Sequence, residues 1–309
     1  MYRSRTLPNF LMIGAPRTGS TALHNALSER PDFFLPQAKE THFFSADADV
    51  SVQELLALGV PYRITASADE YAQFFAGAES FGHRGEIDPS ILARAPHAIP
   101  KLRAHLGNDT KWIVVLRQPV ERAYSHYLLH TRQLSEAYPF ETYVNVVSPR
   151  TAHELVALDR YFGMSFYFEA LSLFFQGFGR KSCLVLLYDD LRNDADAFLR
   201  TILEFLNADS GLVPSLVPET NAGGAPKNFI WRLRAPHHPL RIVARSYLPQ
   251  GLRRYARSVI RWRKPEAQDY VRTSLKAETR ARLMPRYRED ILRTQDLIER
   301  DLTHWLGVI

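Results

Sequence analysis

The feature that most constrains the fold is a short apolar run that leads directly into a glycine-containing loop. Residues 10–13 read FLMI, and residues 14–21 read GAPRTGST. This pattern predicts a buried strand, a tight turn and a helix over 20–29, with Ser20 or Thr21 as its N-cap. Such a turn aims backbone N–H groups and the positive end of a helix dipole at one place, so we expect an anion site there.

The loop differs from the ATP/GTP P-loop at one position. Gly14 and Gly19 have the spacing of G-x-x-x-x-G-K-[ST], but no lysine follows Gly19, and the cation lies inside the loop at Arg17. A P-loop kinase or NTPase would need that lysine at the γ-phosphate. The loop therefore indicates a phosphate cradle for another anionic ligand, with a P-loop kinase or NTPase as the alternative.

Strand and helix patterns alternate along the rest of the chain. Strands are expected over 111–117 and 182–188, with short extended pieces at 33–35 and 41–44. Helices are expected near 69–76 and over 119–131, 166–175, 189–206 and 277–300, the fourth capped by Asp189 or Asp190. The alternation predicts a three-layer α/β fold around a parallel sheet, in a single domain over 1–309.

The composition favours a soluble enzyme. A chain of 309 residues that is 46% hydrophobic can bury one large core or two modest ones. The single cysteine, Cys183, lies in an apolar run, which predicts a buried structural thiol and fits a reducing compartment. No apolar stretch has the length of a membrane span, and the N-terminus lacks the apolar core of a signal peptide. We therefore expect a cytoplasmic location.

The charge is mildly basic and unevenly placed. A formal net charge of +6 suits an anionic ligand, a nucleic acid or an anionic membrane. Many of the basic residues gather in 236–264, with aromatic and aliphatic residues between them. That segment predicts an insertion or lid that covers an acidic acceptor, touches anionic lipid through 240–263, or stays solvated. A second alternative, a non-catalytic binder of nucleic acid or membrane, would rely on this segment.

A second anion motif follows the strand predicted over 111–117. Arg117 ends that strand, at the edge where open α/β sheets bind ligands, and Ser125 falls two turns into the next helix. A guanidinium and a hydroxyl that converge can bind a phosphate. Taken alone, the two residues are better explained as a solvated arginine and a locally packed serine.

Together with a third motif, these boxes resemble those of a known family. Residues 13–21 look like the 5′-phosphosulfate loop of sulfotransferases that use 3′-phosphoadenosine 5′-phosphosulfate (PAPS), and 117–125 resembles their 3′-phosphate motif, R-x-P-x-x-R-x-x-S. The sequence KETHFF at 39–44 resembles the K-E-x-H-F-F box of the carbohydrate branch, which includes the heparan sulfate N- and 3-O-sulfotransferases. The resemblance spans about 8–305 and is closest in style to soluble members of the bacterial type.

The resemblance implies an enzyme that moves a sulfuryl group from PAPS to a hydroxyl or amine and releases 3′,5′-ADP without a metal. Glu40 would be the catalytic base, flanked by Lys39 and by His42, which sets the charge of Glu40 or contacts the sulfuryl group or the acceptor. Arg17 would stabilise the leaving oxygen. The nucleotide would be bound by Arg17, Thr18, Gly19, Ser20, Thr21, Arg117, Ser125 and Lys227, with Arg232 as a weaker candidate.

Two departures from the family pattern bear on function. Many members carry lysine where this chain has Arg17, and an arginine can only stabilise charge, because it does not give up its proton. Residues 86–89 read EIDP where glycan enzymes often have E-K-[ST]-P, which argues against a heparan-like acceptor. Hydroxylated lipid, glycan, glycosylated metabolite and polyketide chain all stay open as acceptors.

Other polar pairs are interpreted structurally. His126 and His130 have helical i, i+4 spacing but no third zinc ligand in sight. Asp189 and Asp190 follow a strand as a Walker-B acid would, yet helix capping explains them more simply.

Overall fold

The computed structural model describes residues 6–46, 65, 67–132, 138–146, 152–211, 213, 214, 216, 224–226 and 270–307. Lys227, Arg232 and the basic segment 236–264 lie outside these residues. The lid expected over 236–264 and the lipid contact expected for 240–263 therefore stay predictions.

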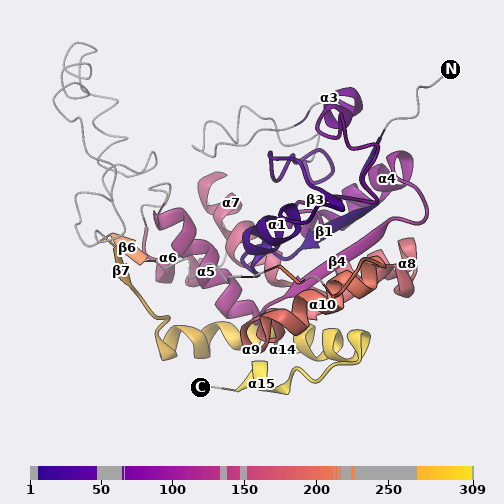
Figure 1. Ribbon diagram of the computed structural model, residues 1–309. Helices are drawn as coiled ribbons and strands as arrows, with labels where there is room; N and C mark the ends of the chain where they lie inside the picture. The colour runs from indigo at the N-terminus through magenta and orange to yellow at the C-terminus, as the bar shows by residue number, and fades with distance from the viewer. Residues whose placement is uncertain are drawn as a thin grey trace, which may run out of the picture.

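Five parallel strands form the centre of the molecule (Figure 1). Their order in the sheet is β2-β3-β1-β4-β5, and β1 pairs with β3 on one side and β4 on the other. Their bounds are β1 Phe10–Gly14, β2 Phe33–Phe34, β3 His83–Ile87, β4 Lys111–Leu116 and β5 Cys183–Leu187. The prediction of an α/β fold with a parallel sheet is confirmed.

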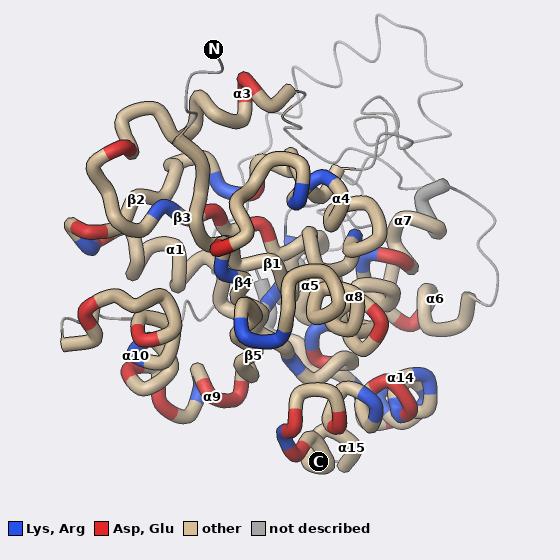
Figure 2. Tube along the Cα trace, turned by 90° about the vertical axis from the view of Figure 1, so that its right-hand side faces the viewer, with Lys and Arg blue, Asp and Glu red and all other residues tan. Residues whose placement is uncertain are grey.

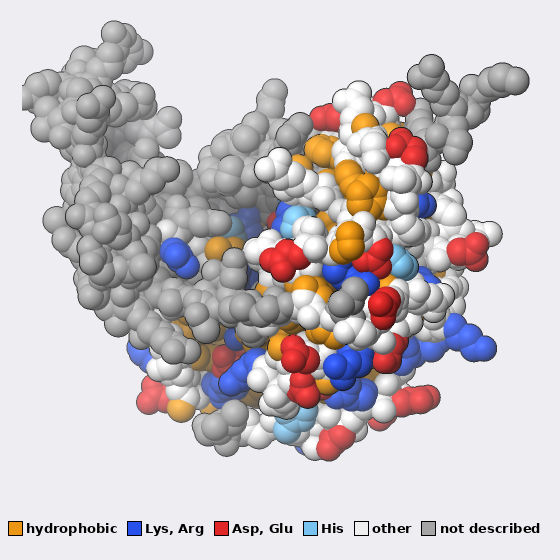
Figure 3. Space-filling view, viewed as in Figure 1, with side chains coloured by type: hydrophobic (Ala, Val, Ile, Leu, Met, Phe, Trp, Pro, Cys, Tyr) orange, Lys and Arg blue, Asp and Glu red, His pale blue; other side chains and the backbone are white. Residues whose placement is uncertain are grey.

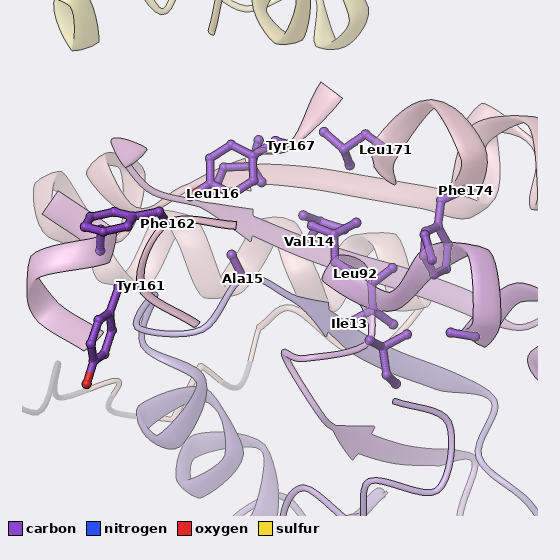
Figure 4. Packing of buried hydrophobic residues seen from close by; sticks show 14 of the residues in the cluster. Ile13, Ala15, Leu92, Val114, Leu116, Tyr161, Phe162, Tyr167, Leu171 and Phe174 are labelled. Atoms are coloured by element: carbon purple, nitrogen blue, oxygen red, sulfur yellow. The ribbon is translucent and has the colours of Figure 1, made fainter. Parts of the chain in front are cut away.

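Helices cover both faces of the sheet, because side chains of a strand alternate between its faces. Leu11 and Ile13 of β1 belong to one core, with α4, α5, α8 and α14, whereas Phe10 and Met12 belong to a second core with α1 and α10. Figure 4 shows part of the first core, where Leu92 packs beside Ile13 and Val114. The helices are α1 Ser20–Ser28, α3 Ala68–Gln73, α4 Ala95–His105, α5 Pro119–Arg132, α6 Phe140–Val144, α7 Ala152–Tyr161, α8 Phe168–Phe178, α9 Tyr188–Asn193, α10 Ala195–Leu206, α14 Ala277–Ile298 and α15 Thr303–Leu306.

The strand order places ligand-binding loops at one edge. All strands are parallel, so the loops that follow Gly14, Ile87, Leu116 and Leu187 leave the sheet at the same edge. The chain builds β2 and β3 on one side of β1 and β4 and β5 on the other, so the crevice between the ends of β1 and β4 is the switch point where such sheets bind ligands. Both predicted anion motifs start there.

Several local predictions were wrong. Helix α1 begins at Ser20, but its N-cap is Gly19 with no side-chain cap, so neither Ser20 nor Thr21 is the cap. The helix expected over 189–206 is two helices, because the chain turns at Asp194, whose carboxylate caps α10 at the N–H of Ala197. Residues 41–44 form no strand: 41 and 42 are irregular, and a turn covers 43–45.

Charges of both signs mix over the described surface. Figure 2 shows acidic and basic residues interspersed along α9, α10 and α14, and Figure 3 shows the same mixture on the lower part of one face. Among the helices of the described residues, none combines the length and the apolar character needed to cross a bilayer. A short antiparallel pair, β6 Gly224–Pro226 and β7 Tyr270–Arg272, lies at the borders of the basic segment.

Candidate active site

The loop between β1 and α1 is held in a tight curve. The Ala15 N–H donates to the Val115 carbonyl at 2.8 Å, and the Thr18 hydroxyl donates to the Ala15 carbonyl at 2.6 Å. Gly14 must be glycine because a Cβ there would lie 2.6 Å from the Leu92 side chain, and Gly19 has a φ of 90°. Since α1 has no side-chain N-cap, the N–H groups of its first turn are available to an anion.

Two arginines meet at the carboxyl ends of β1 and β4. Arg17 Nε donates to the Ser125 hydroxyl at 3.3 Å, and Arg117 Nη1 donates to the Arg17 carbonyl at 3.0 Å. Burial, with the charge of Arg117 as the next cause, lowers the pKa of Arg17 to about 10. Burial also lowers the pKa of Arg117. Each cation is poorly solvated and near the other, so an anion between them would be favoured.

Two aromatic side chains, at the starts of α8 and α9, contact Arg117. Its guanidinium lies 4.6 Å from the centre of the Tyr188 ring, a cation–π contact. The Tyr167 hydroxyl donates to the Arg117 carbonyl at 2.8 Å, which holds the backbone at the end of β4. Tyr188 is a residue of the site that the sequence did not reveal, and its place directly after a strand was the available signal.

The segment 39–46 crosses the same edge in an unusual backbone conformation. Five non-glycine residues of the described ranges have positive φ, and two of them, Asn207 and Glu299, simply end helices. The other three are Arg17 (73°), Glu40 (54°) and His42 (54°), which are all predicted catalytic residues. Strained backbone concentrated in this way is typical of a functional site.

Glu40 lies against both the sheet and the phosphate loop. Its N–H donates to the Ile87 carbonyl at 3.3 Å, at the end of β3. The neighbouring Lys39 Nζ donates to the Thr21 hydroxyl at 2.9 Å and lies 3.9 Å from Glu40 Oε1. Lys39 therefore ties the Glu40 segment to α1.

The Glu40 carboxylate has a raised pKa. The side chain is still 41% exposed, but burial of the rest raises its pKa, and the charge of Asp88 adds to this effect. The positive charges of Lys39 and Arg17, and that of His42 when its ring is protonated, act in the opposite direction. A partly exposed carboxylate with a raised pKa, beside cations, suits a general base.

Two carboxylates at the end of β3 contact this segment. Glu86 accepts from the Thr41 hydroxyl and the Tyr71 hydroxyl, each at 2.5 Å, and burial raises its pKa to about 7. His42 Nδ1 lies 3.0 Å from the Ser45 hydroxyl, which donates to Asp88 at 2.6 Å. In the sequence, EIDP was notable only as a departure from a family pattern. The available signal for the contact with the Glu40 segment was the spacing of Glu86 and Asp88, two residues apart at the end of a strand.

The structure thus brings the three predicted boxes together. Direct contacts join the loop of Arg17 to Ser125 and Arg117, and Lys39 joins the loop to Glu40. Lys227 and the weaker candidate Arg232 lie outside the described ranges, so their predicted contacts with the nucleotide stay predictions.

Several other polar residues have structural partners. Asp190 accepts from the Leu187 N–H at 2.9 Å and pairs with Arg300, and Asp189 accepts from the Trp305 indole at 2.9 Å. Burial raises the pKa of the Cys183 thiol to about 12, in agreement with a structural thiol. In the described ranges, no group of three His, Cys, Asp or Glu side chains is arranged to hold a metal ion.

Comparison with known proteins identifies the family. The family model described as "Sulfotransferase family" matches residues 8–210, which include all three boxes. The chain belongs to the sulfotransferase family. This sulfotransferase is 31% identical over 124 residues to the membrane-associated sulfotransferase kil1 of Dictyostelium discoideum. That match covers 39% of this chain and 22% of the relative, so it spans about a fifth of the length of that protein.

A solved sulfotransferase structure shares the fold. The sulfotransferase from Alicyclobacillus acidocaldarius superposes with a TM-score of 0.69 at 21% identity, covering 98% of this chain and 100% of that one. Agreement over nearly the whole length of both chains supports the α/β architecture described above.

Proposed function

We propose that this sulfotransferase moves a sulfuryl group from PAPS to a hydroxyl or amine and releases 3′,5′-ADP. The observation that carries the proposal is the contact between the two anion motifs: Arg17 with Ser125, and Arg117 with Arg17. PAPS carries a 5′-phosphosulfate and a 3′-phosphate. Two adjacent buried arginines and the open N-terminus of α1 match a ligand with two anionic groups.

The Ser125 hydroxyl would donate a hydrogen bond to a phosphate oxygen of the ligand. A hydroxyl that accepts from Arg17 Nε still has one O–H to donate, and a phosphate oxygen is the acceptor that the neighbouring cations favour. We therefore assign Ser125 and Arg117 to the 3′-phosphate, and Arg17 with the residues 18–21 to the 5′-phosphosulfate.

The chain would supply a base and a fixed positive charge to the transfer. Glu40 would take the proton as the acceptor oxygen or nitrogen forms its bond to sulfur. The bond from sulfur to the phosphate oxygen breaks with its electron pair on that oxygen, where Arg17 stabilises the charge. In an in-line transfer, the acceptor and the leaving oxygen lie on opposite sides of the sulfur. Glu40 would then lie on the acceptor side and Arg17 on the side of the leaving oxygen.

The absence of a lysine after Gly19 supports PAPS over ATP. A P-loop kinase or NTPase holds the γ-phosphate with that lysine and with Mg²⁺, whereas Ser20 follows Gly19 here. The alternative predicts Mg²⁺-dependent ATP binding that is tighter than binding of 3′,5′-ADP, and parallel calorimetric titrations of the two nucleotides distinguish the cases.

The acceptor is proposed only as a class. The box at 39–44 favours the carbohydrate branch, and EIDP at 86–89 disfavours a heparan-like chain. The acceptor would be a hydroxyl or amine of a glycan, a lipid or a small metabolite. A mass-spectrometric screen for compounds that gain one sulfuryl group in the presence of PAPS would identify it.

The decisive experiment measures the 3′-phosphate contact. Arg117→Ala should weaken binding of 3′,5′-ADP by about 2–3 kcal/mol, roughly 30- to 150-fold in Kd, because a charge-assisted contact is lost. Binding of 5′-AMP, which lacks the 3′-phosphate, should change less than about threefold. The exposed Arg288→Ala on α14 is the control. Equal loss for both nucleotides, or no loss for either, would place the 3′-phosphate elsewhere.

A further inference from the structure

The end of β3 carries two buried carboxylates on one face. Glu86 is 2% exposed and Asp88 is 0% exposed, and the residue between them, Ile87, belongs to the core on the opposite face of the sheet. Residues two apart in a strand share a face. Both carboxylates therefore point toward the segment that contains Glu40 and His42, where buried charge is costly unless it is paired.

Glu86 holds the backbone of that segment. Its Oε1 accepts from the Thr41 N–H at 3.3 Å and from the Thr41 hydroxyl at 2.5 Å. Thr41 lies between Glu40 and His42, whose φ values are both positive. The contact explains how two left-handed residues are kept in place, but it does not reach the His42 ring.

Asp88 reaches the His42 ring through Ser45. Asp88 Oδ1 accepts from the Ser90 N–H at 3.0 Å, and Asp88 Oδ2 accepts from the Ser45 hydroxyl at 2.6 Å. Ser45 Oγ in turn lies 3.0 Å from His42 Nδ1, while the direct distance from Nδ1 to Asp88 Oδ2 is 3.6 Å. The hydroxyl is thus the bridge between the two.

If the Asp88 carboxylate is ionised, only one arrangement of protons satisfies the hydrogen bonds that link Asp88, Ser45 and His42. A carboxylate only accepts, so the single proton of the Ser45 hydroxyl is directed to Asp88. The Ser45 oxygen can then only accept from His42, which requires a proton on Nδ1. The proton that His42 gains or loses must then be the one on Nε2.

We infer that Asp88, acting through Ser45, holds His42 in the Nδ1–H tautomer, and that Asp88 and Ser45 are positioning residues for sulfuryl transfer. The inference rests on the proposed function, because it gives His42 a defined state beside the proposed base Glu40. His42 lies near enough that a positive charge on its ring favours the ionised form of Glu40. With Nδ1 committed to Ser45, Nε2 is the nitrogen whose protonation changes that charge.

Nitrogen NMR of the histidine side chains tests the tautomer directly. A pH series in uniformly labelled protein separates the charged from the neutral ring. In the neutral form, the two nitrogens of His42 should show the proton on Nδ1, with the signal assigned by its loss in His42→Asn. A proton on Nε2 in the wild-type protein would overturn the inference without any further variant.

The Asp88→Asn variant tests the role of the carboxylate. An amide can donate as well as accept, so the direction of the hydrogen-bond chain can reverse, and the Nε2–H tautomer should appear. Glu86→Gln is the matched control, because it removes the neighbouring buried carboxylate but touches Thr41 rather than the His42 ring. Ser45→Thr retains the hydroxyl and should keep the wild-type tautomer. An Asp88→Asn spectrum identical to that of the wild type would contradict the inference.

Nucleotide binding separates this inference from the proposed function. The wild-type protein and Asp88→Asn should bind 3′,5′-ADP with Kd values within about threefold of each other, since Asp88 contacts the Glu40 segment rather than the arginine pair. A wild-type protein that binds no 3′,5′-ADP would refute the proposed function while the tautomer is still read from the spectrum. A large loss of binding in Asp88→Asn alone would refute the positioning role.

Discussion

Arg17 is a permanent cation in a place where it is poorly solvated. Its pKa is lowered to about 10 by burial and by Arg117, yet it stays charged at neutral pH. Because Arg17 is protonated at neutral pH, it offers the leaving oxygen a fixed positive charge. Arg17 has a φ of 73°, and its side chain donates to the Ser125 hydroxyl.

Glu40 is the residue on which turnover should depend most. Glu40→Gln should abolish sulfation of an acceptor, with a loss of roughly 10²-fold or more, because an amide cannot take the proton. The affinity for 3′,5′-ADP should stay within about threefold, since Glu40 does not contact the arginine pair. Mass spectrometry of the product and calorimetry with 3′,5′-ADP measure the two effects.

The exposed Glu204→Gln on α10 is the control for Glu40→Gln, as it removes the same formal charge far along the chain from the three boxes. Wild-type turnover in Glu40→Gln would show that another group takes the proton.

At the level of elements, α5 has one face in the site and one in the core. Ser125 faces Arg17, whereas Arg122, from the same motif, is 0% exposed. Arg122 donates to the Ser165 hydroxyl at 2.6 Å, to the Arg160 carbonyl at 2.9 Å and to the Tyr161 carbonyl at 2.7 Å. It therefore fastens α5 to the end of α7 and to the turn before α8.

Removal of Arg122 should be costly to stability. Arg122→Met keeps much of the volume but removes the guanidinium that donates to three buried acceptors, so the free energy of unfolding should fall by about 3 kcal/mol or more. The exposed Arg288→Met should change it by less than about 0.5 kcal/mol. Urea denaturation measures both, and a cost as small as that of Arg288→Met would disprove the bracing role.

The end of β3 should make stability depend on pH. Burial raises the Glu86 pKa to about 7 from 4.5, so between these pH values the folded protein holds a proton that the unfolded chain releases. The contribution of Glu86 to stability is therefore complete below pH 4.5 and is lost as pH rises through about 7. Relative to Glu86→Gln, the wild-type protein should lose at most about 3 kcal/mol over this range.

Urea denaturation of wild type and Glu86→Gln at several pH values from 4.5 to 8 measures the difference. Glu204→Gln again accounts for the loss of one formal charge. Parallel stability curves for wild type and Glu86→Gln would mean that the buried carboxylate titrates in its ordinary range.

At the scale of the whole molecule, helix α15 packs against the ends of β4 and β5, next to the candidate site. Trp305 is 2% exposed, its indole donates to Asp189 at 2.9 Å, and its carbonyl accepts from Gln118 at 3.2 Å. Gln118 follows Arg117, and Asp189 follows Tyr188. Residues near the end of the chain thus brace the ends of β4 and β5, where Arg117 lies on Tyr188.

Trp305→Ala should lower the free energy of unfolding by about 3–5 kcal/mol, because a large buried side chain is removed. Trp305→Phe should cost about 1–2 kcal/mol, since it loses mainly the indole hydrogen bond to a partly exposed carboxylate. Chemical denaturation gives both values. Equal effects of the two variants would assign the whole contribution to the hydrogen bond.

The accuracy of prediction depended on how local each signal is. Strands β1, β4 and β5 and helix α5 were predicted well, because long apolar runs and an N-terminal proline act locally. Strand β3, which reads HRGEI, was missed because it has no apolar run, and its polar Glu86 is buried only through contacts with distant parts of the chain. The helix break at Asp194 was missed because Asp189 and Asp190 offered an equally good cap in sequence.

Residue type and spacing along the chain are enough to identify the phosphate loop, the missing lysine and the order of the three boxes. Three other features are visible only in the folded protein: Arg17 bonds Ser125, Arg122 is buried, and Asp88 reaches His42 through Ser45. These contacts join residues 43 to 108 positions apart or depend on which face of an element is buried. Parallel strands that end at one edge bring such residues together, and spacing along the chain does not encode that meeting.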